Sequence, residues 1–241
     1  MHDEPDPERV SRVVAALAVG ERDPQRSLCA ASAEVVGVSG AGIVLVSAGR
    51  MLGTVCASDT VVEAVEELQY MLGEGPCVDA CRTGTPVLAP DLDALGSGPW
   101  PSFREGAVKA GVRAAFGFPL LVGESCIGAL NLFRTSIGPL RDDQYLDALA
   151  VAGVASRTVL GWQSTARSDS LAWQLEQVPA HRAVVHQASG MVSVQARVSV
   201  GDALVLLRAH AFAAGRTIGS VASDVVNREL VFDGAAPDPE A

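Results

Sequence analysis

The spacing of apolar residues predicts an α+β domain in the first two thirds of the chain. Two apolar runs, 42–47 and 51–57, flank a short turn and predict a β-hairpin. A second pair of runs flanks Gly123 and Glu124 and predicts another. Helical spacing covers 7–20, 24–37, 60–72 and 102–111, and a short strand covers 86–91. Two hairpins with helices at the ends and in the crossings indicate an antiparallel sheet flanked by helices.

Helical spacing dominates the remainder. Apolar residues from Asp142 to about Gln177 recur at loosely heptad-like steps, which predicts a long connecting helix that pairs with its copy in a homodimer. Pro179 interrupts helical hydrogen bonding, and three short helices follow it. We therefore expect an N-terminal helix and polar tail (1–24), a sheet domain (25–160), the connecting helix (161–177), an all-α three-helix module (178–232) and a disordered tail (233–241).

The three-helix module has amphipathic faces that can be assigned from the sequence. In its last helix, the expected buried residues are Ile218, Val221, Ala222 and Val225. The first helix is expected to pack through one face and to expose another. The packing face would contain Val184, Ala188, Met191, Val192 and Gln195, and the exposed face Arg182, His186, Ser189, Ser193 and Arg197. In the sheet domain, the helix over 60–72 is expected to pack through Val61, Val65, Leu68 and Leu72, with Glu63, Glu66 and Glu67 elsewhere.

Composition and charge exclude some classes of protein. With 241 residues, 49% hydrophobic and 19% charged, the chain can bury a sizeable core. The net charge of −10 argues against a surface covered in phosphate-binding groups. Residues 1–160 have 12 basic and 20 acidic side chains, a balance of −8, whereas 176–232 has five arginines against four acidic residues, a balance of +1. This shift also favours two modules.

The acidic N-terminus and the absence of any run of 18 apolar residues predict a cytoplasmic protein that does not contact a membrane. The five cysteines are odd in number and irregularly spaced, so no disulfide framework is expected and the thiols should be reduced. Loops for phosphate binding and motifs for zinc proteases or serine hydrolases are missing, which indicates that the chain is not an enzyme.

The stretch "GEGPCVDACRTGTPV", residues 73–87, could hold a reactive thiol pair, a metal or only a turn. Its glycines and Pro76 suit a helix stop and a tight turn, after which Cys77 and Cys81 would share one face of a short helix. A zinc site would need three or four clustered ligands, so no metal is predicted. Buried cysteine packs as a small hydrophobe, which favours a structural role for Cys77; a redox pair of Cys77 and Cys81 is the further possibility.

Residues 178–232 resemble an ANTAR module, the RNA-binding output domain of bacterial transcription antitermination regulators. The resemblance depends on residues at the family spacing, namely Arg182, Gln187, Ala188, Gly190, Met191, Ser199, Ala203, Leu206, Leu207, Arg208, Val221, Ala222 and Val225. Upstream, "GEGPCVDACRTGTPVLAPDL", "WPSF" and "GFPLLVGESCIGALNLFR" resemble the GAF domain that precedes ANTAR modules in many actinobacterial regulators. The resemblance implies a GAF sensor of an unknown signal and an ANTAR module that binds paired hairpins in nascent RNA.

Within the ANTAR resemblance, arginines can bind phosphate, and amides can contact base edges in hairpin loops. The candidate RNA-binding residues are Arg182, His186, Gln187, Arg208, Arg216 and Arg228. One departure is Ser189, where the family commonly has lysine. If that lysine contacts phosphate, Ser189→Lys should tighten RNA binding.

The GAF resemblance implies a small-molecule site or an upstream sensor protein as a partner, with no cofactor identified. Candidate pocket residues are Trp100, Phe103, Phe116, Phe118, Leu130 and Leu132. Two alternatives remain: a ligand- or partner-binding GAF sensor whose ANTAR-like part only dimerises, and a cysteine-based methionine sulfoxide reductase of the GAF fold. The cysteine arrangement of that enzyme is not found here.

Overall fold

The computed structural model describes residues 7–17, 24–47, 50–94, 98–166 and 180–232, and the chain divides into two compact units, 1–165 and 166–241. The first unit contains a five-stranded sheet in the order β2-β1-β5-β4-β3, with antiparallel neighbours throughout. Its strands are β1 (Gly40–Ser47), β2 (Arg50–Ala57), β3 (Val87–Ala89), β4 (Ala114–Val122) and β5 (Ser125–Arg134). Both predicted hairpins are confirmed, β1 with β2 and β4 with β5.

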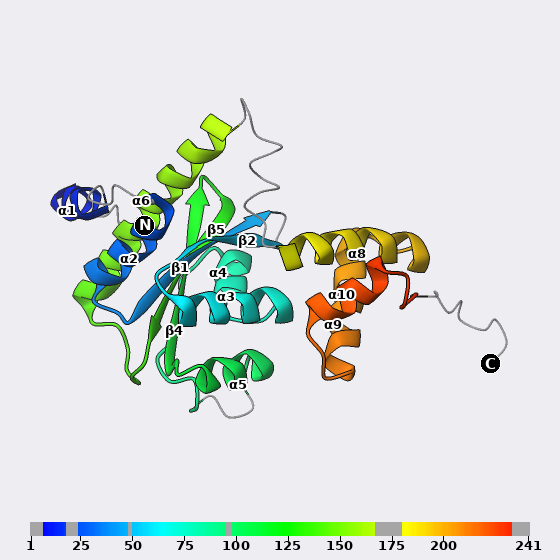
Figure 1. The fold of residues 1–241 in the computed structure, drawn as a ribbon. Helices are drawn as coiled ribbons and strands as arrows, with labels where there is room; N and C mark the ends of the chain where they lie inside the picture. The colour runs from blue at the N-terminus through cyan, green and yellow to red at the C-terminus, as the bar shows by residue number, and fades with distance from the viewer. Residues whose placement is uncertain (1–6, 18–23, 48–49, 95–97, 167–179, 233–241) are drawn as a thin grey trace. The chain divides into compact units, whose positions relative to one another are not determined.

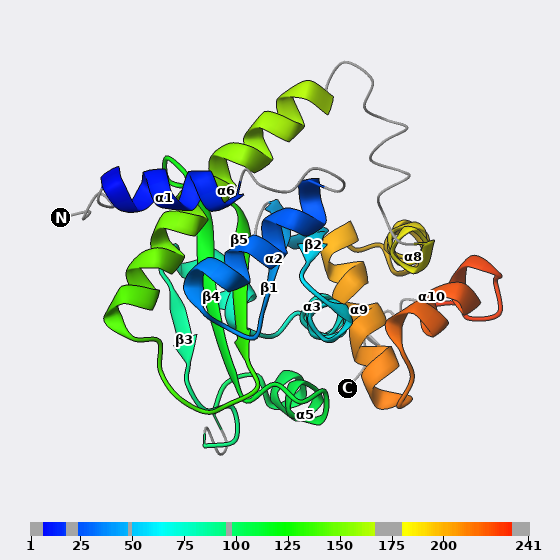
Figure 2. The ribbon, with the colours of Figure 1, turned by 60° about the vertical axis from the view of Figure 1, so that its left-hand side comes forward.

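Helices cover both faces of this sheet (Figures 1 and 2). One face is covered by α2 (Pro24–Val36) and α6 (Asp142–Ala166), and α1 (Pro7–Leu17) packs on the outer side of these helices. The other is covered by α3 (Thr60–Leu72), α4 (Pro76–Thr83) and α5 (Pro101–Lys109). The predicted α+β architecture is therefore confirmed.

Successive side chains of a strand alternate between these two faces because the side-chain period is two. Phe116 pairs with Leu132 and Phe118 with Leu130, and all four side chains belong to the core beneath α2 and α6. Ala115 and Phe133 pair on the opposite face. This alternation decides which residues can share a site.

The stretch between α3 and β3 folds as its turn residues predict. Helix α3 begins at the N-cap Asp59, whose carboxylate accepts hydrogen bonds from the backbone of Val61 and Val62, and it ends at Gly73 in the left-handed conformation. Pro76 begins α4, where its missing N–H costs nothing, and Gly84 ends it, again left-handed. The two glycines confine α4 to a short helix on the sheet.

The second unit consists of α8 (Ala180–Ala196), α9 (Val200–Ala213) and α10 (Ile218–Val226). Ser199 and Thr217 cap α9 and α10, each accepting a hydrogen bond from the backbone N–H three residues later. Helix α8 packs against both of the others. Residues 167–177, the last part of the predicted connecting helix, and 233–241, the predicted disordered tail, lie outside the described residues.

The buried face of α10 agrees with the sequence, and its four predicted core residues are each at most 2% exposed. The prediction for α8 was correct for Ala188 and Val192, but the packing face was otherwise shifted by about one residue. Its buried stripe is Val185, Ala188, Ser189 and Val192, whereas Met191 and Gln195 are half-buried. A shift of one residue rotates the packing face by about 100°.

No single helix in the described part of the chain is both long and apolar enough to cross a membrane. Helices Ala183–Ala196 and Val200–Ala213 pass that test together, but they are bent by 102° at the break.

Candidate functional site

The candidate RNA-binding residues lie at several places on the three-helix unit. His186 and Gln187 are exposed on α8, and Arg228 is exposed just after α10. Arg208 is half-buried on α9. The side chain of Arg182 lies outside the described residues.

Arg216 follows α9 and is held by α10. Its guanidinium donates to the Asp224 carboxylate at 2.7 Å and to the Ser220 hydroxyl at 2.6 Å. The hydrogen bond that Arg216 donates to Asp224 raises the pKa of Arg216 above its ordinary value. Because Asp224 partly neutralises this cation, Arg216 is less available to phosphate than its sequence suggests.

Two arginines occupy left-handed backbone positions where a helix ends. Arg197 follows α8 with φ of 56°, and Arg228 follows α10 with φ of 64°. The left-handed conformation costs roughly 1–2 kcal/mol for a residue with a Cβ. An arginine there also places positive charge near a helix C-terminus, which is favourable. Arg197 is exposed and was not among the candidates; the sequence signal was an arginine at the position usually occupied by glycine.

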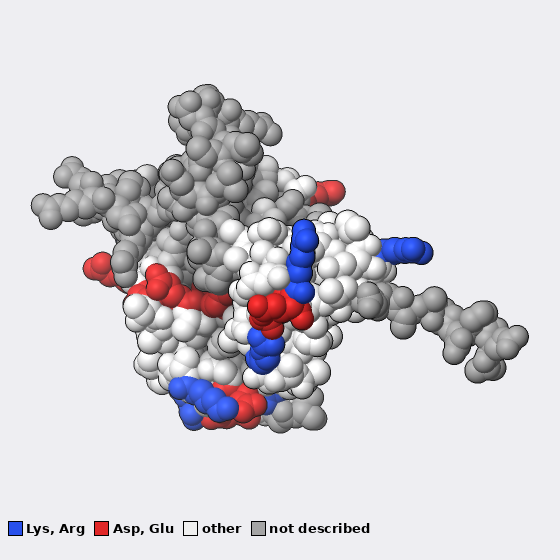
Figure 3. All heavy atoms as spheres, turned by 45° about the vertical axis from the view of Figure 1, so that its right-hand side comes forward, with Lys and Arg blue, Asp and Glu red and all other residues white. Residues whose placement is uncertain are grey.

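The described basic side chains do not merge into one patch on the face drawn in Figure 3. Blue groups are separate from one another, several lie beside red carboxylates, and most of the described surface is white. This face therefore does not present a broad cationic surface of the kind that attracts RNA through its phosphates.

Ser189 does not share an exposed face with His186, contrary to the sequence expectation. It is 2% exposed, and its hydroxyl donates to the carbonyl of Val185 at 2.8 Å. A serine hydroxyl that bonds the preceding turn needs no other partner inside a helix. Ser189→Lys would therefore place an ammonium group at a buried position instead of adding a phosphate contact.

In the first unit, the residues predicted to line one ligand pocket lie on opposite faces of the sheet. Phe116, Phe118, Leu130 and Leu132 face α2 and α6, whereas Trp100 and Phe103 pack with α3 and α5. A sheet separates the two groups, so they cannot contact one small molecule together. The prediction was wrong because strand side chains alternate between the two faces of the sheet, and the segment with Trp100 and Phe103 packs on the face opposite to the four strand residues.

A buried polar cluster that the sequence did not reveal lies between α3 and the sheet. Glu66 is fully buried, and the Asn131 amide of β5 donates to its two oxygens at 2.8 and 2.9 Å. The Gln69 amide donates to Glu66 at 3.2 Å, and its oxygen accepts from the backbone of Cys77 at 3.1 Å. The cluster therefore joins α3, β5 and α4 through side-chain hydrogen bonds.

Glycines make room for this cluster. A Cβ at Gly42 would lie within van der Waals overlap of a Glu66 oxygen, and one at Gly75 would overlap Gln69. A Cβ at Gly117 would lie 2.6 Å from the backbone oxygen of Pro76. Burial is the main cause that raises the pKa of the Cys77 thiol well above its ordinary value, and the Glu66 carboxylate adds to it. A buried thiol held neutral is a poor nucleophile.

The other cysteines form two pairs, which corrects the expectation of five unpaired thiols. Disulfides join Cys29 to Cys56 and Cys81 to Cys126, with Cα atoms 6.0 and 5.6 Å apart. Cys77 is free and buried. The proposed redox pair of Cys77 and Cys81 is therefore wrong, because the partner of Cys81 comes from β5.

Trp100 has an unusual backbone conformation on the α4 side of the sheet. Its φ of 57° is rare for a bulky residue, and its indole N–H donates to Asp79 at 3.0 Å. The ring also meets Phe103 edge-on, with centroids 6.4 Å apart. These contacts hold the segment before α5 against α4.

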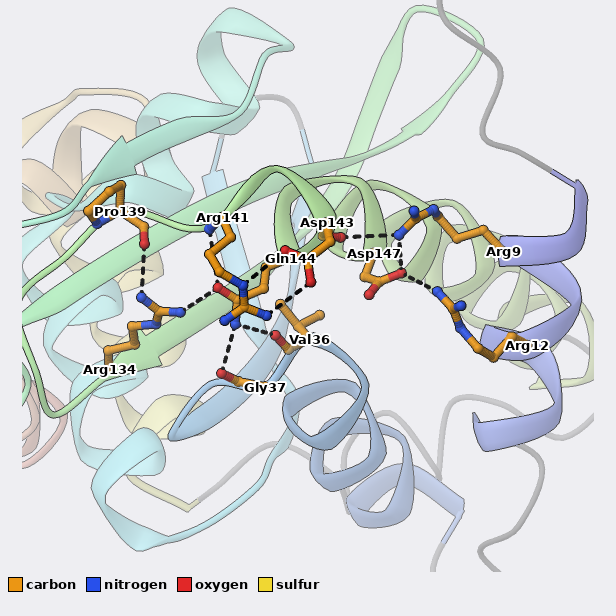
Figure 4. A network of polar contacts seen from close by, with 10 residues as sticks. All are labelled: Arg9, Arg12, Val36, Gly37, Arg134, Pro139, Arg141, Asp143, Gln144 and Asp147. Carbon is orange, nitrogen blue, oxygen red and sulfur yellow. Dashed lines mark hydrogen bonds and ion pairs between the residues drawn. The ribbon is translucent and has the colours of Figure 1, made fainter.

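A polar network joins the N-terminal end of α6 to the rest of the sheet domain (Figure 4). The Gln144 amide donates to the carbonyls of Val36 and Gly37 at 2.8 and 3.0 Å. Its oxygen accepts from Arg134 at 2.6 Å and from the backbone of Arg141 at 3.1 Å. One buried side chain thus connects α6 to the end of α2 and the end of β5.

A second contact in Figure 4 attaches α1 to α6. Arg9 and Arg12 both donate to the Asp147 carboxylate, the latter at 2.8 Å. Arg9 also donates to the carbonyl of Asp143 at 3.1 Å. A carboxylate shared by two guanidinium groups fixes α1 beside the first turns of α6.

Comparison with known families agrees with both units. A GAF domain model matches residues 12–153, and an ANTAR domain model matches residues 173–226. The chain belongs to the GAF family and carries an ANTAR domain. GAF domains are sensory modules and ANTAR domains are RNA-binding antitermination modules, so the domain architecture fits a regulator. No curated protein matches the chain in sequence.

Solved structures share the GAF fold. The GAF domain of an Acinetobacter phosphoenolpyruvate-protein phosphotransferase is 13% identical with a TM-score of 0.51, covering 66% of this chain and 96% of that one. The corresponding domain from Coxiella burnetii is 9% identical with a TM-score of 0.48, covering 67% and 94%. The free methionine-R-sulfoxide reductase of Neisseria meningitidis is 17% identical with a TM-score of 0.45, covering 65% and 93%. Only the first likeness informs the fold, and none informs activity.

Proposed function

We propose that this protein binds hairpins in nascent RNA through α8–α10 and prevents transcription termination, under the control of a signal received by its GAF domain. The observation that carries the proposal is the coincidence of the ANTAR match, residues 173–226, with a separately folded three-helix unit that follows a GAF domain. The exposed imidazole, amide and guanidinium of His186, Gln187 and Arg228 suit loop bases and phosphates. Such a regulator would work in the cytoplasm beside its transcripts.

The test begins with sequencing of RNA cross-linked to the full chain in its native cell. A recovered RNA is then measured against wild type and against the double variant Arg182→Ala, Arg208→Ala. Each lost phosphate contact should lower the salt slope by about 0.7–0.9. Arg82→Ala, an exposed arginine of the GAF unit, is the matched control and should leave affinity unchanged. Unaltered affinity in the folded double variant would contradict the assignment.

A GAF sensor whose ANTAR part only dimerises is the competing proposal. The scattered charge in Figure 3 and the Arg216–Asp224 ion pair favour it. It predicts no recovered transcript and an unchanged dimer in the double arginine variant. Recovery of specific RNA would exclude it.

We further propose that the protein is a homodimer and that α6 carries the signal out of the GAF domain, whose input is a small ligand or a sensor protein. Support comes from Gln144, which joins α6 to both α2 and β5, so a shift in the sheet reaches the helix directly. Sedimentation of a monomer with full RNA affinity would contradict the homodimer.

A further inference from the structure

Helix α9 exposes an apolar stripe that the described chain leaves uncovered. Buried residues occupy one side of the helix, while the exposed residues recur with helical spacing on the other. The exposed apolar members of this α9 stripe are Val205, Leu206, Ala209, Phe212 and Ala213. A helix that is apolar on both sides normally buries both, so the stripe needs an occupant.

Phe212 is the most informative member of the α9 stripe. Its side chain is 72% exposed near the end of α9, and it is the one aromatic residue of the stripe. Arg208 lies one helical turn before it at the edge of the stripe, and His210 borders the other edge. An exposed ring beside a guanidinium is the combination on which unpaired bases stack while their phosphates are neutralised.

The size of the stripe argues against a second copy of the chain as its occupant. A helix of 14 residues is about 21 Å long, and the stripe consists of two alanines, one valine and one leucine beside one ring. A stable interface buries about 800 Å² per partner and involves about 20–30 residues on each side. One base on Phe212, with a neighbour against Val205 and Ala209, matches the available surface better.

We propose that Phe212 stacks on an unpaired base of the RNA hairpin loop and that the α9 stripe holds the adjoining nucleotide. This inference rests on the proposed RNA binding and goes beyond it by assigning base contact to α9. Base stacking on an aromatic residue contributes enough that its loss weakens binding about 5- to 150-fold. The contribution depends on the ring rather than on charge, so it should persist at high salt.

The test measures affinity of the full chain for a two-hairpin RNA recovered by cross-linking. Phe212→Ala and Phe212→Leu should both weaken binding, whereas Phe212→Trp should keep it. Val194→Ala, which trims an apolar side chain of α8 that is 80% exposed, is the matched control and should change nothing. The same RNA carrying 5-iodouridine in its loops should cross-link to Phe212 on irradiation.

The outcomes separate this inference from the proposed function. If wild type binds no RNA, both fail. If wild type binds but Phe212→Ala binds equally well, or Phe212→Leu keeps full affinity, stacking is wrong while RNA binding stands. If Phe212→Ala instead converts a dimer to a monomer, and RNA affinity falls only as far as the loss of the dimer explains, a second copy covers the stripe. The inference is then overturned.

Discussion

The hydrogen bonds between Asn131 and Glu66 should be a main source of stability in the GAF unit, and a double-mutant cycle tests this. Both residues are at most 1% exposed, and the Asn131 amide donates to both carboxylate oxygens at 2.8 and 2.9 Å. In these bonds both Glu66 oxygens act as acceptors. Asn131→Ala would leave a buried carboxyl group with fewer donors.

The expected change in the free energy of unfolding has two parts, the lost hydrogen bonds and the cavity. Two hydrogen bonds at about 0.5–1.5 kcal/mol each contribute about 1–3 kcal/mol, and the cavity left by the truncated amide adds about 1 kcal/mol. We expect Asn131→Ala to lower the free energy of unfolding by about 2–4 kcal/mol. In Glu66→Gln one of the two acceptor oxygens becomes an NH2 donor, so the coupling energy between the two positions should be about 1–3 kcal/mol.

The assay is the urea dependence of hydrogen exchange in peptides from β1 and β5, which reports the GAF unit without interference from α8–α10. Wild type, Asn131→Ala, Glu66→Gln and the double variant complete the cycle. Asn227→Ala, an exposed asparagine after α10, is the control and should stay within about 0.5 kcal/mol. A coupling energy below about 0.5 kcal/mol would refute the reasoning, because the bonds would then add nothing beyond packing.

Three further predictions follow from burial and contact geometry. Thiol titration of the unreduced, denatured chain should find one free thiol, Cys77, and five thiols after reduction. Because the pKa of Cys77 is raised in the folded chain, the free energy of unfolding should be at its full value below pH of about 8.5 and should fall as the pH rises further. Gly117→Ala should lower the unfolding free energy by about 1–3 kcal/mol, since its Cβ would lie 2.6 Å from the backbone of Pro76, whereas Gly153→Ala, with open space around it, should raise it by up to about 1 kcal/mol. Ser189→Lys should lower the thermal midpoint of α8–α10 without tightening RNA binding, since Ser189 is 2% exposed; tighter binding with unchanged stability would contradict its buried placement.

The strands and the last helix could be predicted because their signals are local. The second hairpin follows from two apolar runs around Gly123, which has a φ of 59°, and α10 follows from a clear period of apolar residues. Helix α8 could not be placed as well because small and polar residues surround its apolar positions. Moving the predicted packing face by one residue therefore changes its fit to the apolar spacing only slightly, but it moves Ser189 from the surface to the core.

The buried cluster and the disulfides could not be predicted because their causes are distant in sequence. Glu66 reads as a surface residue of an amphipathic helix, but Asn131, 65 residues later, supplies two of the hydrogen bonds that its buried carboxyl group accepts. Likewise Cys81 is four residues from Cys77 in sequence, but its partner Cys126 comes from 45 residues away. Such pairings depend on strand order and register, which no local window contains.

The charge arrangement of α8–α10 bears on how this protein would choose its RNA. Attraction to phosphate is independent of sequence and grows with the number of available cations. Here Arg216 is bound to Asp224, whereas His186, Gln187, Phe212 and Arg228 are exposed. Amides, imidazoles and aromatic rings contact bases, and bases are accessible in loops rather than in stems. A surface of this kind gains little from a duplex stem and most from unpaired nucleotides, so its selectivity would come from the loops of its targets.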